Sequence, residues 1–199
     1  MSEIIVMRHA PTASNINEVY MGILDTPLSD TYDMDVRQLK EIFTENGCTF
    51  CYTSPLKRAY DTARVLFSED YIIVDKRIIE RDLGLWAGVS KKTIRDEYPL
   101  AFNENGTMDF YYTPEKGEPF MVLVRRVADF LISIHSLGTS IAIVTHNGVI
   151  RVMKSLILGT GLSEVFSQHE PHLKPQRFSI NENVIRIITE DCFYTVDRT

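Results

Sequence analysis

The chain has 199 residues, of which 44% are hydrophobic and 24% are charged, and its formal net charge is −6 at pH 7. This length suffices for one domain with a substantial core, and the composition is typical of an ordinary soluble globular protein. The acidic balance and the lack of a basic run argue against a nucleic-acid partner. No apolar run approaches the roughly 20 residues that span a bilayer, so we expect no membrane partner either.

The amino-terminal residues and the cysteines bear on the cellular compartment. Met1-Ser2-Glu3 is acidic and leads straight into an expected strand, so no signal peptide is visible and we expect a cytoplasmic protein. Three cysteines, an odd number, do not make a disulfide framework. Cys48 and Cys51 form a C-x-x-C pattern, which can indicate a redox pair or half a zinc site. Because no second pair exists, we interpret both as packing residues on opposite faces of a strand.

The chain opens with an expected strand and helix. Residues 4–7 are four apolar residues in a row, which is typical of a buried parallel strand. After a turn at residues 25–29, we predict a helix that Ser29 caps and that extends to about Glu45, where Asn46-Gly47 ends it. The residues of its inward face are Val36, Leu39, Ile42 and Phe43.

A second strand, helix and strand follow. Residues 49–53 predict a short strand, and Ser54-Pro55 is a strong helix start, with the serine as cap and the proline in the first turn. Residues 72–75 predict a further strand. The inward stripe of the helix consists of Leu56, Ala59, Ala63, Leu66 and Phe67.

The periodic pattern loosens after residue 79. Residues 80–119 contain many aromatic side chains among charges and turn residues, with one short predicted helix at residues 90–98. We interpret this stretch as a cap or lid within the domain, because a linker would not be so aromatic.

The last third of the chain returns to a regular alternation. Residues 119–136 predict an amphipathic helix, residues 140–145 a fully apolar strand, and residues 149–158 a further helix. An extended pair, residues 184–189 and 193–196, is expected at a sheet edge.

Strands that alternate with helices imply right-handed crossovers. We therefore predict an α/β fold of three layers, with a mainly parallel central sheet and helices on both faces. Residues 1–199 form one domain in this reading, with the small cap inserted at about residues 80–119. Exposed edge strands in the tail would permit a homodimer.

Three predicted strand ends carry polar, chemically active residues. Arg8 and His9 end the first strand, Arg58 lies in the first turn of the helix after the second, and His146 follows the apolar strand at residues 140–145. In a parallel sheet these ends face the same way, so two histidines and two arginines can line one crevice. Two helix amino termini add N–H donors, which makes a phosphate site. In isolation, Arg58 could be a solvated helix residue and His146 a hydrogen-bonded core histidine.

These residues match a known family pattern. The run Arg8-His9-Ala10-Pro11-Thr12-x-x-Asn15 resembles the R-H-G-x-T-x-x-N signature of the histidine phosphatase superfamily, which includes the phosphoglycerate mutases. The sequence departs from the pattern at Ala10, Tyr32 and Asn147, where glycine is usual, and none of these changes removes a reacting group. The resemblance continues, in the family's order, through residues 25–29, 54–63, 80–88, 117–118 and 145–151.

The resemblance implies a phosphoglycerate mutase-like fold and a role for each matching residue. His9 would be the nucleophile that takes the phosphoryl group, and Glu80 would protonate the departing oxygen and later activate water. A salt bridge of Glu80 with Arg77 or Arg81 is the alternative. Arg8, Arg58, His146, Asn15, Asn147 and, more weakly, Thr12 would hold the phosphate.

General chemistry is consistent with these roles. An imidazole attacks phosphorus only when it is neutral, and neighbouring guanidinium groups disfavour its protonated form. The same cations stabilise the charge on the equatorial oxygens during transfer. We therefore expect neither a metal nor another cofactor, and the sequence shows no carboxylate cluster typical of magnesium sites.

Two further groups of residues are considered for the site. Arg81, Trp86 and Tyr111 are candidates for the leaving-group pocket, with core packing as the alternative for the aromatic residues. His169 and His172 flank Glu170, but they lack the i, i+4 helical spacing of a zinc motif, so we interpret them as loop residues.

The sequence thus predicts a metal-independent phosphomonoester hydrolase of the histidine acid phosphatase type, acting on a small phosphorylated metabolite through phosphohistidine. Two alternatives stay open: a phosphoglycerate mutase-type transferase, and a phosphate- or phosphoprotein-binding module without chemistry. We favour hydrolysis because the stretch after Glu80 is shorter than the one that mutases generally use to grip a carboxylate. A nucleotide-binding Rossmann protein is disfavoured because residues 4–15 contain no G-x-G-x-x-G.

Overall fold

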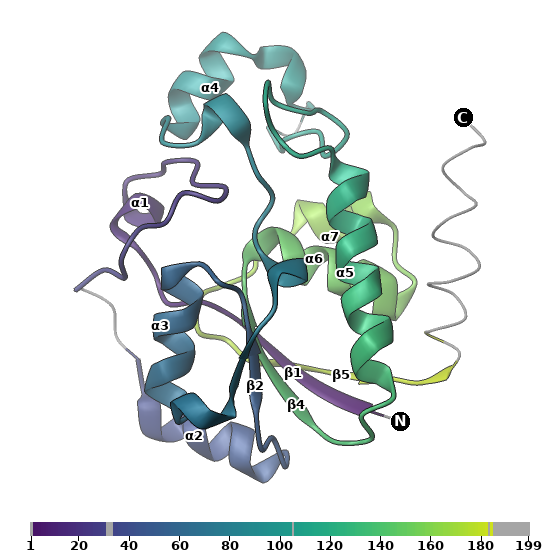
Figure 1. Ribbon diagram of the computed structural model, residues 1–199. Coiled ribbons are helices and arrows are strands. Elements are labelled where there is room, and N and C mark those ends of the chain that lie inside the picture. The colour runs from purple at the N-terminus through teal and green to yellow at the C-terminus, as the bar shows by residue number, and fades with distance from the viewer. Residues whose placement is uncertain (1, 31–33, 105, 183, 185–199) are drawn as a thin grey trace.

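A computed structural model describes residues 2–30, 34–104, 106–182 and 184. Its centre is a five-stranded sheet in the order β3-β2-β4-β1-β5 (Figure 1). Only β5 runs antiparallel to its neighbour, so the prediction of a mainly parallel α/β sheet is confirmed. The strands are β1 (Ser2–Arg8), β2 (Cys51–Thr53), β3 (Ile72–Val74), β4 (Ile141–Thr145) and β5 (Gln176–Ile180).

The register of the parallel strands brings three carboxyl ends to one edge of the sheet. Arg8 pairs with Thr145 across β1 and β4, and Thr53 pairs with Val144 across β2 and β4. The N–H of His9 donates to the Thr145 carbonyl at 2.9 Å, which extends the ladder by one residue beyond β1. The residues that follow these strands are therefore neighbours in space.

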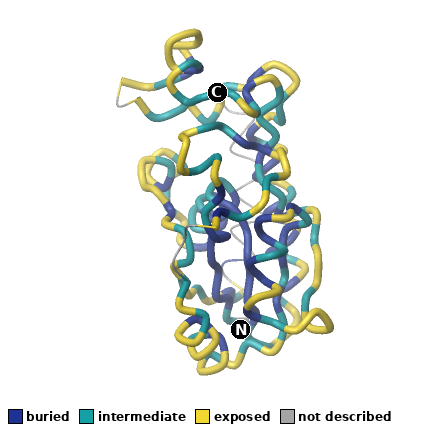
Figure 2. Tube along the Cα trace, turned by 90° about the vertical axis from the view of Figure 1, so that its left-hand side faces the viewer, coloured by how far each residue is buried: buried dark blue, intermediate teal, exposed yellow. Residues whose placement is uncertain are grey.

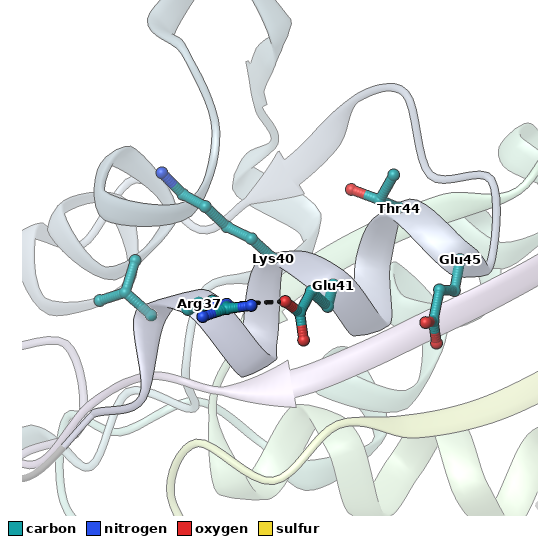
Figure 3. A pocket seen from close by; sticks show the side chains of 6 residues that line it. Arg37, Lys40, Glu41, Thr44 and Glu45 are labelled. Carbon is teal, nitrogen blue, oxygen red and sulfur yellow. Dashed lines mark hydrogen bonds and ion pairs between the residues drawn. The ribbon is translucent and has the colours of Figure 1, made fainter.

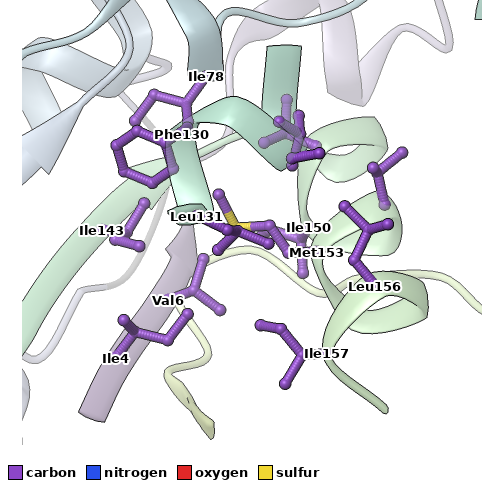
Figure 4. Close-up of a cluster of buried hydrophobic side chains, with 14 of the residues drawn as sticks. Ile4, Val6, Ile78, Phe130, Leu131, Ile143, Ile150, Met153, Leu156 and Ile157 are labelled. Atoms are coloured by element: carbon purple, nitrogen blue, oxygen red, sulfur yellow. The ribbon is translucent and has the colours of Figure 1, made fainter. Parts of the chain in front are cut away.

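Alternate side chains of β1 enter two different cores. Ile4 and Val6 pack with α5 and α6 (Figure 4). Ile5 and Met7 pack with α2 and α3 on the opposite face. Both faces of the strand are buried, which explains why its sequence is continuously apolar rather than alternating. The covering helices are α2 (Val36–Glu45), α3 (Lys57–Leu66), α5 (Phe120–His135) and α6 (Asn147–Leu158).

The start of α2 differs from the sequence prediction. The carboxylate of Asp35 accepts from the N–H of Gln38 at 2.9 Å and is the N-cap, so Ser29 is not. Ser29 is buried instead, and its N–H donates to the Pro11 carbonyl at 2.9 Å. The outward face of α2 is polar, with Arg37 Nε 2.9 Å from the Glu41 carboxylate (Figure 3).

Ser54 is not a helix cap either. The N-cap position of α3 is Leu56, whose N–H donates to the Ser54 Oγ at 3.2 Å. The hydroxyl of Ser54 is directed to His146, so a residue that the sequence assigns to helix initiation belongs to the histidine environment.

The two described cysteines share one core. Because β2 begins at Cys51, Cys48 precedes the strand, and both residues pack in the cluster that contains Leu39 and Phe43. The prediction that they point to opposite faces was therefore wrong. Both are free thiols, and burial raises the pKa of Cys48 to about 11.

The cap stands beyond the carboxyl edge of the sheet (Figure 1) and is more exposed than the sheet (Figure 2). It contains α4 (Lys91–Glu97), close to the predicted short helix, and its own small core around Trp86. The Trp86 ring stacks on Phe102 and Tyr112 at centroid distances of 6.2 and 5.3 Å. The aromatic residues of this stretch thus form a local core.

Several short elements were not predicted. These are α1 (Ala13–Ile16), α7 (Leu162–Ser167) and β5, together with the 3-10 turns η1 (Glu69–Tyr71), η2 (Lys76–Ile78), η3 (Gly84–Trp86) and η4 (Pro99–Ala101). The strand pair expected at residues 184–189 and 193–196 lies outside the described residues except for Val184. Within the described ranges, no helix combines the length and apolarity needed to cross a membrane.

Gly84 provides a test of how the cap is joined to the domain. Its φ is +52°, and a Cβ at this position would lie 2.1 Å from the Glu115 carbonyl oxygen. We expect Gly84→Ala to lower the free energy of unfolding by about 1–3 kcal/mol or more, measured by urea denaturation. Gly161→Ala is the control, because φ there is −60° and no atom lies within 4 Å of the added Cβ. Its cost should stay within about 1 kcal/mol, and equal losses in both variants would contradict the prediction.

Candidate active site

His9 lies at the end of β1 with only 3% of its surface exposed, and it lines a cavity of about 370 Å³ between the sheet edge and the cap. Its Nδ1–H donates to the Ala10 carbonyl at 2.7 Å. This bond sets the tautomer and leaves Nε2 with a free lone pair. The ring centroid is 5.2 Å from that of His146 and 5.1 Å from that of His172.

Two buried guanidinium groups flank His9. Arg58 from α3 donates to the carbonyls of Leu24 and Gly22 at 2.6 and 2.7 Å, and Arg8 donates to the Glu170 carbonyl at 2.8 Å. The Nε of each arginine is buried and finds no partner among the described residues. Both arginines line the cavity, so each keeps hydrogen-bonding capacity for an anion.

His146 lies beside His9 and is fully buried. Its Nε2 is 2.7 Å from the Ser54 Oγ, whereas its Nδ1 has no partner in the described part of the chain. It does not line the cavity. The structure therefore brings the two predicted histidines together, with His146 behind His9 as seen from the cavity.

The environment keeps both imidazoles neutral. Burial, followed by the charges of Arg58 and Arg8, lowers the pKa of His9 well below its ordinary value. Burial and the Arg58 charge lower the pKa of His146 in the same way. Desolvation is the larger cause, and the guanidinium effect that the sequence suggested adds to it. Burial also lowers the pKa of Arg8 to about 10, so this arginine remains a cation at neutral pH.

Glu80 is half-buried and is the carboxylate that lines the cavity. Its Oε2 accepts from the Gly148 N–H at the start of α6 at 3.2 Å, and its Oε1 accepts from the Arg81 N–H at 2.9 Å. A Cβ on Gly148 would lie 2.5 Å from the carboxylate, so glycine is what allows this close approach.

The two arginines considered as salt-bridge partners of Glu80 bind other groups. Arg77 pairs with Asp75 at 2.6 Å. The Arg81 guanidinium donates to the main-chain carbonyls of Phe110, Tyr112 and Glu118. Arg81 thus lines the cavity, as expected, but its guanidinium mainly joins the cap to the domain.

The three polar candidates for phosphate contact have different positions. Asn15 and Asn147 line the cavity. Thr12 is fully buried, is not a lining residue, and caps α1 with its Oγ1 2.9 Å from the Asn15 Oδ1. The structure therefore contradicts a direct phosphate contact for Thr12 and gives it a role in holding Asn15, because an N-cap hydroxyl points along its own helix.

Two candidates for the leaving-group pocket lie elsewhere. Trp86 is 2% exposed within the cap core, and Tyr111 is 64% exposed, and neither lines the cavity. Aromatic packing holds Trp86 inside the cap, and Tyr111 turns outward, so neither side chain reaches this cavity. The lining side chains that sequence reasoning missed include Lys91, Arg95, Met108, Phe110, Arg151 and Phe166.

The His169–His172 segment also lies at the site. His172 donates from Nδ1 to the His9 carbonyl at 2.6 Å, and Arg8 donates to the His169 Nε2 at 3.3 Å. Burial lowers the pKa of His172 to about 4. These are loop residues, as predicted, but their contact with the site was missed, since only the fold shows it. In the described ranges, no group of three or more His, Cys, Asp or Glu residues could hold a metal ion.

The sequence and the fold are those of a known family. The model of the histidine phosphatase superfamily (branch 1) matches residues 4–188, and the chain belongs to that superfamily. It is 29% identical over 171 residues to Phosphoserine phosphatase 1 of Hydrogenobacter thermophilus, a match that covers 84% of this chain and 81% of the relative. The resemblance that the sequence motifs suggested is thereby confirmed.

Two further comparisons agree with this assignment. The chain is 32% identical over 160 residues to Phosphoglycerate mutase-like protein 4 of Arabidopsis thaliana, covering 75% of this chain and 68% of that protein. The solved structure of YhfR from Bacillus stearothermophilus matches with a TM-score of 0.79 at 25% identity, covering 92% of this chain and 93% of that one.

The histidine cluster predicts a pH dependence of stability. His9, His146 and His172 have pKa values in the folded state below the ordinary histidine value of about 6.5. The unfolded chain therefore binds more protons than the folded chain below pH 6.5. The free energy of unfolding is highest above pH 6.5 and decreases as the pH falls below that value. We expect His172→Asn to reduce the slope of unfolding free energy against pH between about 4 and 6.5. Urea denaturation at a series of pH values measures this slope, and a slope equal to that of the wild type would contradict the prediction.

Proposed function

We propose that the protein is a phosphomonoester hydrolase that works through a phosphohistidine on His9, with Glu80 as general acid and base. The observation that carries the proposal is the neutral imidazole of His9, whose Nδ1 is bonded to a carbonyl and whose pKa is lowered by two buried arginines with unpartnered Nε–H groups. Such an arrangement combines a nucleophile with cations that stabilise the charge of a transferring phosphoryl group.

The proposed reaction has two steps. In the first, Nε2 of His9 forms a bond to phosphorus, the bond to the alcohol oxygen breaks, and Glu80 supplies the proton that this oxygen needs. In the second, Glu80 accepts a proton from water, the water oxygen binds phosphorus, and the electron pair of the P–N bond returns to Nε2. The products are the alcohol and inorganic phosphate, and the carboxylate ends in the protonation state in which it began.

In this scheme, side chains of the protein neutralise the negative charge of the phosphoryl group. Arg8 and Arg58 would contact the phosphoryl oxygens, together with the side chains of Asn15 and Asn147. His146 does not line the cavity, so in this proposal it packs beside His9, with ring centroids 5.2 Å apart, and does not itself contact the phosphoryl oxygens. The proposed mechanism therefore requires no metal ion and no cofactor.

The rest of the cavity supports a small substrate with a second anionic group. Arg8 and Arg58 are assigned to the phosphate, and the guanidinium of Arg81 is bonded to main-chain carbonyls, so Lys91, Arg95 and Arg151 are the remaining lining cations. Among the described lining residues, Glu80 is the one carboxylate. Phosphoserine phosphatase 1 acts, by its name, on a phosphoester that carries a carboxylate, which fits this excess of positive charge.

A mutase is the second candidate, since one relative is a phosphoglycerate mutase-like protein. A mutase would return the phosphoryl group from His9 to an organic acceptor, whereas a hydrolase transfers it to water. A binding module would take up phosphate without either reaction. Retention of labelled phosphate in phosphoglycerate, with little free phosphate, would favour the mutase.

Substitution of His9 tests the nucleophile. We expect His9→Ala to lower the hydrolysis of phenyl phosphate by about 10⁴-fold or more, in the presence of a chelator, because no group remains to form the covalent intermediate. His135→Ala, at the end of α5, is the matched control and should retain activity. Equal turnover by His9→Ala and the wild type would eliminate the proposed nucleophile.

Turnover of phenyl phosphate also tests the proposed phosphohistidine intermediate. Glu80→Gln should slow the attack of water, so an acid-labile phosphoryl group on His9 should accumulate during turnover of phenyl phosphate and be detected by mass spectrometry after rapid quenching.

Arg95 tests the substrate class. We expect Arg95→Gln to raise KM for phosphoserine about tenfold and to leave KM for phenyl phosphate unchanged, because only the first substrate carries a second anion. Arg125→Gln is the control, since Arg125 is exposed on α5 and does not line the cavity. Equal changes for both substrates would count against the second anionic group.

A further inference from the structure

Glu170 is a buried carboxylate that the proposed mechanism does not use. It is only 2% exposed, although it lies in the loop between α7 and β5. Its Oε1 accepts from the Lys154 ammonium at 2.9 Å and its Oε2 from the Gln176 amide at 2.6 Å. Lys154 belongs to α6 and Gln176 to β5, so the side chain of Glu170 is held from two separate elements.

The main chain of Glu170 contacts two residues of the site. Its carbonyl accepts from Arg8 Nη1 at 2.8 Å, and its N–H donates to the Asn147 Oδ1 at 3.2 Å. The first contact directs the guanidinium of Arg8 and leaves its Nε free. The second orients Asn147 at the start of α6, where it lines the cavity.

Two residues that follow Glu170 in the same loop add further contacts to the site. His172 donates to the His9 carbonyl at 2.6 Å, and the N–H of Leu173 donates to the Arg8 carbonyl at 3.1 Å. The loop therefore holds both the side chain of Arg8 and the main chain that carries Arg8 and His9. A displacement of this loop would move the phosphate ligands and the nucleophile together.

We propose that Glu170 is a positioning residue of the phosphoryl site, which acts through Arg8 and Asn147 and is itself fixed by Lys154 and Gln176. The physical reason is preorganisation: a long arginine side chain loses less freedom on binding an anion if a fixed carbonyl already holds it. The buried carboxylate needs a partner of opposite charge, and Lys154 provides it. The inference rests on the proposed phosphoryl site but not on turnover.

The alternative is that the Lys154–Glu170 pair only joins α6 to β5. The two roles differ in what they predict for Arg8. A positioning role makes the effect of Glu170 depend on Arg8, whereas a purely structural role changes stability and acts on phosphate binding equally with or without Arg8.

The test is a double-mutant cycle read out by binding of inorganic phosphate and by hydrolysis of phenyl phosphate. We expect Glu170→Gln to raise the phosphate Kd and to lower kcat/KM on the order of 10- to 100-fold. In an Arg8→Lys background the same substitution should have less than about a threefold effect, because the guanidinium that the Glu170 loop holds is then absent. Glu164→Gln, at an exposed position of α7, is the matched control and should change neither quantity.

Equal losses in both backgrounds, or an unchanged phosphate Kd in Glu170→Gln, would overturn the proposal. If Glu170→Gln does not fold, Gln176→Leu removes one of the two side-chain contacts and should weaken phosphate binding in the same direction; an unchanged Kd there would also overturn it. A wild-type protein that binds phosphate but hydrolyses nothing would contradict the hydrolase, and the phosphate affinities would then decide the role of Glu170. A wild-type protein that does not bind phosphate would overturn both.

Discussion

Parallel pairing of β1 with β4 is the constraint on which the site depends. The ladder places Arg8 opposite Thr145, so His9 and His146 follow neighbouring strands and their rings lie 5.2 Å apart. A shift of one residue would send every side chain of β1 to the opposite face, and both faces are core. The observed register keeps Ile4 and Val6 in one core and Ile5 and Met7 in the other, and it brings the two imidazoles together.

The site carries an energetic cost that the surrounding loops offset in part. Burial disfavours the charged forms of Arg8 and Arg58 and lowers the pKa of each. Main-chain carbonyls of Gly22, Leu24 and Glu170 accept their hydrogen bonds, which leaves the Nε–H groups unsatisfied. An anion in the cavity would satisfy those groups and neutralise the cations. In the proposed function, the hydrogen-bonding capacity of these two guanidinium groups is what binds the phosphoryl group.

The sequence of the cap predicts that its aromatic side chains pack together, but it does not predict which side chains line the cavity. Its aromatic composition indicates a packed unit, and Trp86 is indeed the centre of one. The same aromatic character suggested that Trp86 and Tyr111 line the pocket, whereas the cap contributes Lys91, Arg95, Met108 and Phe110 instead. Composition indicates that side chains pack, but the path of the backbone decides which of them face the cavity.

The sequence by itself determined the parts whose signals are local. Apolar runs and helical periodicity specify the central strands and the long helices, and short segments such as Arg8-His9 identify the candidate reacting groups. The tertiary structure decided the contacts between distant segments: Ser54 with His146, Glu170 with Arg8 and Asn147, and Arg151 at the cavity. Arg8 and Glu170 are 162 residues apart in the chain. No local pattern encodes such a contact, because it arises only when packing brings strand ends and loops to the same edge of the sheet.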